Sequence, residues 1–139
     1  MKPVIVFACV ILGAWVSQEC EAQLPPEERQ TLKKVHASCQ SDLATRVEKE
    51  KLKNMDKYFN DIQVGAHMRC MATKLGFISE QGLMNREVVR SKIALVTPDE
   101  SKVDVVMEKC AKQQKTPEKT AVLLSLCFYQ NGVQYHHGI

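Results

Sequence analysis

Apolar residues recur mostly at helical spacing along this chain, and the alternating patterns typical of strands are nearly absent. Leu32, Val35 and Cys39 stand at positions i, i+3 and i+7 of one stripe. Residues 103–110 carry a second stripe, with apolar side chains at i, i+3, i+4 and i+7. Residues 121–129 are apolar almost all round, which is typical of a buried central helix. The pattern therefore predicts an all-α protein.

Prolines, glycines and capping residues mark the expected helix ends. The run Pro25-Pro26-Glu27-Glu28 places proline and carboxylates in a first turn, and Gly76 stands where a helix C-terminus prefers glycine. We expect Thr97 to cap a helix, Pro98 to take its first position and Glu100 to complete a capping box. Together these signals predict about six helices: 24–43, 44–53, 62–75, 88–96 after a loop at 79–84, one that begins at 98, and one that opens at 116.

The N-terminal segment has the pattern of a secretory signal peptide. Lys2 precedes an uncharged apolar run, residues 4–16, and the small residues Cys20 and Ala22 follow it. We expect cleavage after Ala22, which leaves a single secreted, extracellular domain of residues 23–139. The apolar run is too short to span a bilayer, and no other stretch reaches the roughly 18 apolar residues that a membrane helix needs.

Charge and cysteine content narrow the class of protein. Removing residues 1–22 changes 19 basic and 16 acidic residues to 18 and 14, a net charge of +4. The richest charge run, residues 48–57, mixes both signs, which favours a solvated helix face over a nucleic-acid patch. An even number of cysteines in an exported chain predicts two disulfides, with three connectivities open, among Cys39, Cys70, Cys110 and Cys127.

The search for catalytic motifs finds none. The sequence holds no nucleophile elbow, metalloprotease motif, phosphate loop or dinucleotide fingerprint. Paired carboxylates such as Glu27 and Glu28 stand at helix starts, where the helix dipole accounts for them. We therefore expect neither an enzyme nor a cofactor.

Two histidines form a pattern with the cysteines. His36 and His67 each precede a cysteine by three residues, so each pair lies on one helix face. Two such pairs have the ligand set of a two-Cys, two-His zinc site. Exported thiols usually oxidise, so we favour disulfides and expect no metal site. We expect both histidines to be ordinary exposed helix residues; groups that titrate near pH 6.5 are the alternative.

The cysteine spacing leaves 30, 39 and 16 residues between successive cysteines of the predicted mature chain. It resembles that of the insect odorant-binding protein family, of the pheromone and general odorant-binding type, whose six cysteines lie on a six-helix frame around an apolar cavity. Two family cysteines are absent, since their positions fall on Ala66 and Glu118, and this is similar to the four-cysteine, or minus-C, subclass. Residues 70–76 and 118–127 also resemble the family. The resemblance implies disulfides Cys39–Cys70 and Cys110–Cys127.

The resemblance also implies a function: a secreted carrier that binds small hydrophobic molecules, such as odorants or pheromones, in an internal cavity. A largely apolar last helix suits the wall of such a cavity, and methionine fills irregular apolar space. The implied partners are the ligand and, downstream, a membrane odorant receptor, for a monomer or weak homodimer. The candidate lining residues are Met68, Met71, Leu75, Met84, Val89, Ile93, Met107, Leu123, Leu124 and Phe128, with Tyr129 as the candidate for one hydrogen bond.

The sequence leaves other interpretations of function open. A secreted helical interaction protein of salivary or venom type would keep the architecture without a functional cavity. A metal-binding secreted protein, built on the two histidine–cysteine pairs, is less favoured. His136 and His137 lie on a C-terminal tail that would weaken binding in acid if it closed over an opening; a disordered tail is the favoured alternative.

Overall fold

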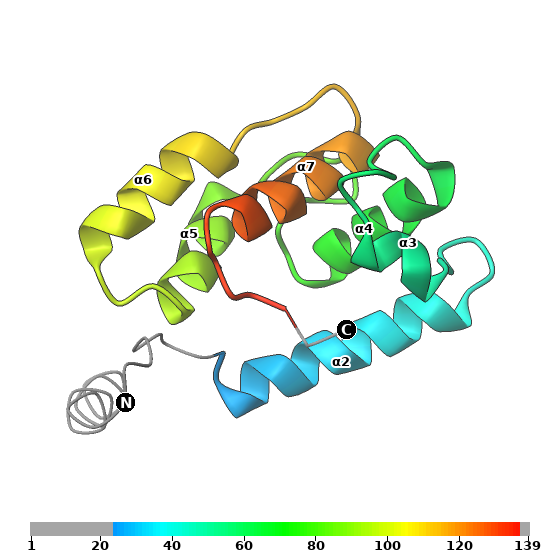
Figure 1. The fold of residues 1–139 in the computed structure, drawn as a ribbon, viewed down its shortest axis with the longest axis horizontal. Helices are drawn as coiled ribbons and strands as arrows, with labels where there is room; N and C mark the ends of the chain where they lie inside the picture. The colour runs from blue at the N-terminus through cyan, green and yellow to red at the C-terminus, as the bar shows by residue number, and fades with distance from the viewer. Residues whose placement is uncertain (1–23, 137–139) are drawn as a thin grey trace.

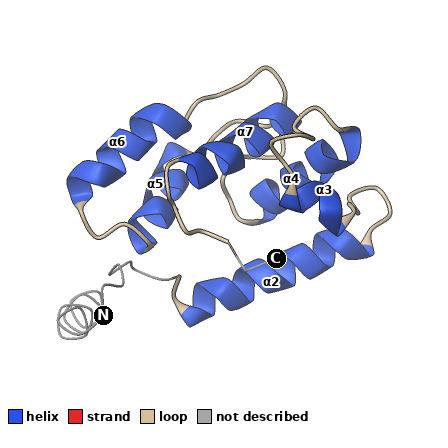
Figure 2. Ribbon diagram, viewed as in Figure 1, coloured by secondary structure: helices blue, strands red, loops and turns tan. Residues whose placement is uncertain are grey.

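Six α-helices make up the described part of the protein in this computed structural model, which describes residues 24–136 (Figure 1). Figure 2 shows no strand among these residues, where Ile78 and Met84 form an isolated bridge, so the all-α prediction is confirmed. The predicted signal peptide, residues 1–22, and His137 lie outside the described residues. The helices are α2 (Pro26–Ser41), α3 (Lys49–Lys53), α4 (Ile62–Lys74), α5 (Arg86–Leu95), α6 (Glu100–Cys110) and α7 (Pro117–Gln130).

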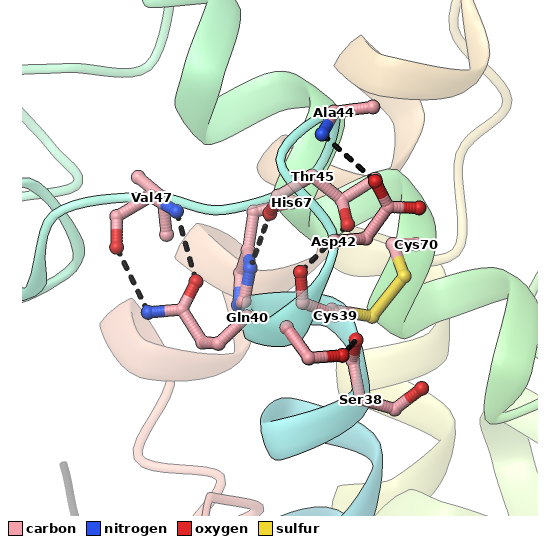
Figure 3. The surroundings of a disulfide bond; sticks show 10 residues. Ser38, Cys39, Gln40, Asp42, Ala44, Thr45, Val47, His67 and Cys70 are labelled. Atoms are coloured by element: carbon pink, nitrogen blue, oxygen red, sulfur yellow. Dashed lines mark hydrogen bonds between the residues drawn. A yellow bond between two sulfur atoms is a disulfide. The ribbon is translucent and has the colours of Figure 1, made fainter.

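The linker between α2 and α3 is longer than predicted. The expected helix 44–53 is wrong in its first half, because side chains hold this stretch in turns. Asp42 Oδ1 accepts a hydrogen bond from the Ala44 N–H at 2.9 Å, as in an Asx turn. The Gln40 amide bonds both the N–H and the carbonyl of Val47, each at 2.8 Å (Figure 3). These bonds satisfy backbone groups that a helix would otherwise pair.

Helix starts follow their capping side chains. The Thr116 hydroxyl caps α7 by accepting from the Lys119 N–H at 3.1 Å, as the sequence predicts. The expected start at Thr97 and Pro98 is wrong, since α6 begins at Glu100. Asp99 Oδ1 accepts from the Ser101 N–H at 3.0 Å and from its hydroxyl at 2.7 Å, so Asp99 caps in place of Thr97.

The central helix is α7, which packs against α4 on one side and α6 on the other (Figure 1). Its buried side chains include Ala121, Val122, Leu124 and Phe128. Tyr129 is 82% exposed, so the expectation of burial through residue 129 fails at its last position. The rotation of about 100° per residue takes Tyr129 off the face that buries Phe128.

The helices α5 and α6 form a densely packed layer beside α7. Val89, Ile93 and Val103 are at most 1% exposed and belong to the main core, together with Met107. The loop before α5 lies against the start of α7, where Gly82 has a φ of +87° and leaves no room for a side chain beside Pro117. This layer packs against α7 through α6.

Two disulfides cross-link the helices. Cys39 of α2 is bonded to Cys70 of α4 with a Cα–Cα separation of 6.0 Å (Figure 3). Cys110 of α6 is bonded to Cys127 of α7 with a Cα–Cα separation of 5.4 Å. These are the two bonds that the family resemblance implies. Both join helices that also pack against each other, so each bond clamps an existing interface.

Candidate functional site

A cavity of about 110 Å³ lies between α2, α4 and α7. Its walls come from these helices, from α3 and the residue Met55 beyond it, from the end of α4, and from the C-terminal segment, which Figure 1 shows running back from α7 toward α2. Most of the lining side chains are apolar. The complete set is Leu32, His36, Leu52, Met55, His67, Met68, Met71, Ala72, Leu75, Phe77, Ala121, Leu124, Ser125, Phe128, Tyr135 and His136.

Helical periodicity explains why α4 and α7 supply most of the wall. On α7 the lining positions are 121, 124, 125 and 128, which is the i, i+3, i+4, i+7 pattern of one helix face. On α4 they are 67, 68, 71 and 72, continued by Leu75 just past the helix end. The two faces oppose each other across the cavity.

Five of the eleven predicted lining residues border this cavity: Met68, Met71, Leu75, Leu124 and Phe128. The other six do not. Val89, Ile93 and Met107 are buried in the packed layer of α5 and α6, and Met84 packs against that core from the loop before α5. Leu123 lies on α7 between two lining positions, and Tyr129 points to solvent, so it offers no hydrogen bond to the cavity.

The polar groups of the cavity are the ones that sequence reasoning missed. His36, His67, Ser125, Tyr135 and His136 all line it. His67 is 1% exposed and His36 is half-buried, so the expectation of ordinary exposed histidines is wrong. The sequence carried a usable indication of this, because each histidine stands three residues before a disulfide-bonded cysteine. The Cys39–Cys70 bond joins the two helix faces and thereby brings the histidine rings to a centroid separation of 5.1 Å, edge to face.

Burial governs the charge of both histidines. The Nδ1 atom of His67 lies 2.9 Å from the carbonyl oxygen of Thr45, a contact visible in Figure 3. Burial lowers the pKa of His67, a contribution that outweighs the opposing effect of the Thr45 bond, and His36 lowers it further. Burial also lowers the pKa of His36. Both rings are therefore neutral at neutral pH.

The C-terminal segment is fastened to α2 at the edge of the cavity. The Tyr135 hydroxyl donates a 2.6 Å hydrogen bond to Glu28, and Lys92 of α5 lies 2.5 Å from the same carboxylate oxygen. Burial opposes ionisation of Glu28, but the bonds from Lys92 and Tyr135 outweigh it, so the pKa of Glu28 is lowered. Burial and the adjacent Glu28 raise the pKa of Tyr135, which stays a hydrogen-bond donor.

The zinc alternative finds no support in this geometry. All four cysteines within residues 24–136 are in disulfides, so none is available as a thiolate ligand. The part of the chain that the structure describes holds no group of three or more histidine, cysteine or acidic side chains placed to bind one ion. Within the same residues, no helix combines the length and the apolar character needed to cross a membrane.

Comparison with known proteins agrees with this architecture. The chain is 24% identical to the B2 protein of Tenebrio molitor over 104 residues, which covers 75% of this chain and 81% of that protein. It is 23% identical to the B1 protein of the same species over 101 residues, 73% of this chain and 78% of that protein. No solved structure matches significantly. The model of the PBP/GOBP family matches residues 21–131, and the chain belongs to this family of odorant-binding type.

Proposed function

We propose that the protein is a secreted carrier of small hydrophobic molecules, which bind in the cavity between α2, α4 and α7. The observation that supports this is a mostly apolar cavity in a member of the PBP/GOBP family. Ligand affinity then comes mainly from removing apolar surface from water. Catalysis is no part of the proposal.

The size of the cavity bounds the ligand. An apolar cavity of about 150 Å³ holds a benzene ring, so a cavity of about 110 Å³ takes a short chain as it stands and a single small ring once its side chains move. Met55, Met68 and Met71 line it with flexible side chains that can move to admit longer ligands. For a ligand of seven or eight heavy atoms we expect roughly −6 kcal/mol, a Kd of tens of micromolar.

Secretion belongs to the same proposal. The positive start and apolar run before Ala22 have the form of a signal peptide. Two disulfides suit an oxidising, extracellular compartment. A carrier of this kind would move poorly soluble molecules through extracellular fluid, with a membrane odorant receptor as the downstream candidate.

The methionines offer a test that needs no substitution. Three of them, Met55, Met68 and Met71, line the cavity, whereas Met84 and Met107 do not. With carbon-13 methyl labels on methionine, titration with toluene should shift the first three signals and leave the other two nearly unmoved. The full chain is expressed in a secreting insect cell line, so the medium also shows whether residues 1–22 are removed.

Substitutions that fill the cavity provide the control for the toluene titration. Ala121→Leu and Ala72→Leu place three extra carbons in the cavity and should abolish toluene binding while the protein stays folded. Ala94→Leu on α5 adds the same carbons outside the cavity and should bind toluene as the native chain does. If toluene moves no methionine signal, or if both filled variants bind it normally, the cavity is not the site and the interaction-protein reading gains ground.

A further inference from the structure

The ring nitrogens of His67 can be assigned one by one. A carbonyl oxygen only accepts hydrogen bonds, so the Nδ1 atom that lies 2.9 Å from the Thr45 carbonyl must carry the proton. A neutral imidazole has one proton, and Nε2 is then a bare acceptor. Burial keeps the ring neutral by lowering its pKa. His67 therefore brings a fixed acceptor to the wall of an apolar cavity.

Neighbouring groups restrain the orientation of this ring. The His36 ring packs edge to face against it from α2, and the Thr45 carbonyl holds its Nδ1 edge. The ring is 1% exposed, so bulk water does not surround it. A preorganised acceptor in a water-poor site favours a ligand that donates a hydrogen bond, since any other ligand leaves the acceptor unpaired.

We propose that Nε2 of His67 accepts a hydrogen bond from the ligand, so that the cavity selects small apolar alcohols and phenols over ethers of the same size. The inference rests on the proposed carrier function and adds the chemical class of its ligand. The Tyr135 oxygen keeps an acceptor lone pair while its proton goes to Glu28 at 2.6 Å, but His67→Asn leaves this oxygen in place, so the substitution isolates the part played by Nε2. Ser125 is the other hydroxyl in the wall, and a donor there would instead favour carbonyl and ether ligands.

The proposal can be tested by comparing the affinities of two constitutional isomers. Benzyl alcohol and anisole have the same atoms, but the first can donate a hydrogen bond and the second cannot. The net value of one hydrogen bond predicts a preference for benzyl alcohol of about three- to tenfold in Kd. His67→Asn keeps a donor for the Thr45 carbonyl and removes the acceptor at Nε2, so it should reduce the ratio of the two Kd values by that factor. The difference in hydration between the two ligands is the same for both proteins, so it cancels when the ratio of the native protein is compared with that of His67→Asn.

Control variants and a spectroscopic measurement separate the effect of His67 from that of other groups. Ser125→Ala should keep the preference for benzyl alcohol, because His67 carries it, and Tyr129→Phe, which changes an exposed side chain outside the cavity, should leave both Kd values unchanged. Nitrogen-15 spectra of the native protein give a readout without substitution. The bare Nε2 resonance of His67, identified by its loss in His67→Asn, should move toward the protonated range with benzyl alcohol and stay in place with anisole.

The outcomes distinguish the two proposals. An equal ratio of the two Kd values in native and His67→Asn proteins, or a native preference for anisole, overturns the role of His67 while toluene binding keeps the carrier function. A His67 that carries its proton on Nε2 in the ligand-free protein overturns it too. If toluene, benzyl alcohol and anisole all leave the lining methionines unmoved, the carrier function itself is wrong.

Discussion

At the residue scale, His67 makes the folded protein sensitive to mild acid. Its pKa is lowered by burial, and so is that of its neighbour His36, from an ordinary value of 6.5. Below pH 6.5 the two histidines become protonated in the unfolded chain, whereas in the folded chain they stay neutral down to a lower pH. The unfolded state then binds more protons than the native state, so stability falls as the pH falls. Above pH 7 both states are neutral at these positions and the contribution is constant.

The direction of this pH dependence predicts the pH range in which stability should be lost. The free energy of unfolding, measured by urea titration, should decrease between pH 6.5 and pH 5, and His67→Asn should show a smaller decrease. The carboxylates with lowered pKa, among them Glu28 and Glu118, lose their stabilising effect at lower pH, so they contribute little in this window. Equal pH dependence in both proteins would show that His67 already accepts a proton in the folded state.

At the element scale, the C-terminal segment depends on a few contacts. Val133 donates from its N–H to the Phe128 carbonyl at 2.9 Å, and the Tyr135 ring packs edge to face on Phe77 at a centroid separation of 5.7 Å. The hydrogen bond to Glu28 then ties this segment to α2, from the other end of the chain. The segment forms one wall of the cavity, and Tyr135 ties it both to Phe77 and to α2.

We expect Tyr135→Phe to loosen this wall. The ring and its packing on Phe77 remain, but the hydrogen bond to a carboxylate is lost, which costs about 1.5 to 3 kcal/mol. Urea unfolding measures the loss, and exchange of the Val133 amide proton should become faster. Tyr129→Phe is the matched control, since that side chain is 82% exposed and its change should stay within about 0.5 kcal/mol. Equal effects of the two substitutions would mean that the Tyr135 bond contributes nothing.

Sequence patterns predicted some elements well and others poorly, for identifiable reasons. The bounds of α4 and α7 follow from strong local signals: Gly76 with a φ of +86° after α4, and the Thr116 cap followed by Pro117 as the first residue of α7. The linker before α3 was missed because side-chain-to-backbone bonds from Gln40 and Asp42 hold it. Such bonds depend on where the chain returns in space, which propensity does not report.

The cavity was only partly predictable for a different reason. The stripe on α6 that includes Met107 has the same spacing as the lining stripe on α7, yet it meets a packed neighbour instead of open space. An apolar stripe shows which face a helix buries, whereas the packing of the whole fold decides whether that face meets a side chain or a cavity. The polar lining groups depend on a disulfide that joins two helices, so they too are set above the level of the element.

At the scale of the whole molecule, α7 divides the fold into two functionally different sides. The cavity is lined from α2, α3, α4 and α7, while no side chain of α5 or α6 borders it. Close to Ala66 and Glu118, the two positions at which the resemblance to the family puts a cysteine that this chain lacks, α4 and α7 meet through other contacts. The Glu118 carboxylate pairs with Arg69 at 2.9 Å, and the Glu118 Cβ lies 3.1 Å from the point that a Cβ on Gly65 would occupy. Of the two disulfides, Cys39–Cys70 joins two helices that line the cavity, and Cys110–Cys127 joins α7 to α6, on the other side.

This division predicts that the two disulfides differ in function more than in stability. Replacing Cys39 and Cys70 together by alanine, or Cys110 and Cys127 together, should lower the free energy of unfolding by about 3 to 4 kcal/mol in the chain-entropy model. The sequence separations are 31 and 17, but the model depends only on the logarithm of loop length, so the two losses are similar. Toluene affinity should respond differently. The first pair clamps α2, which carries Leu32 and His36, onto α4.

Loss of the Cys39–Cys70 bond should therefore weaken toluene binding by about tenfold, since the α2 wall and the contact between the two histidine rings both loosen. Loss of the Cys110–Cys127 bond should change it by less than about twofold, because α6 contributes nothing to the lining. Both variants are compared at a temperature where urea titration shows each to be almost fully folded, so that the fraction of unfolded chain does not enter the affinity. A similar loss of affinity in the two variants would mean that the cavity depends on the rigidity of the entire fold and not on the clamp beside it.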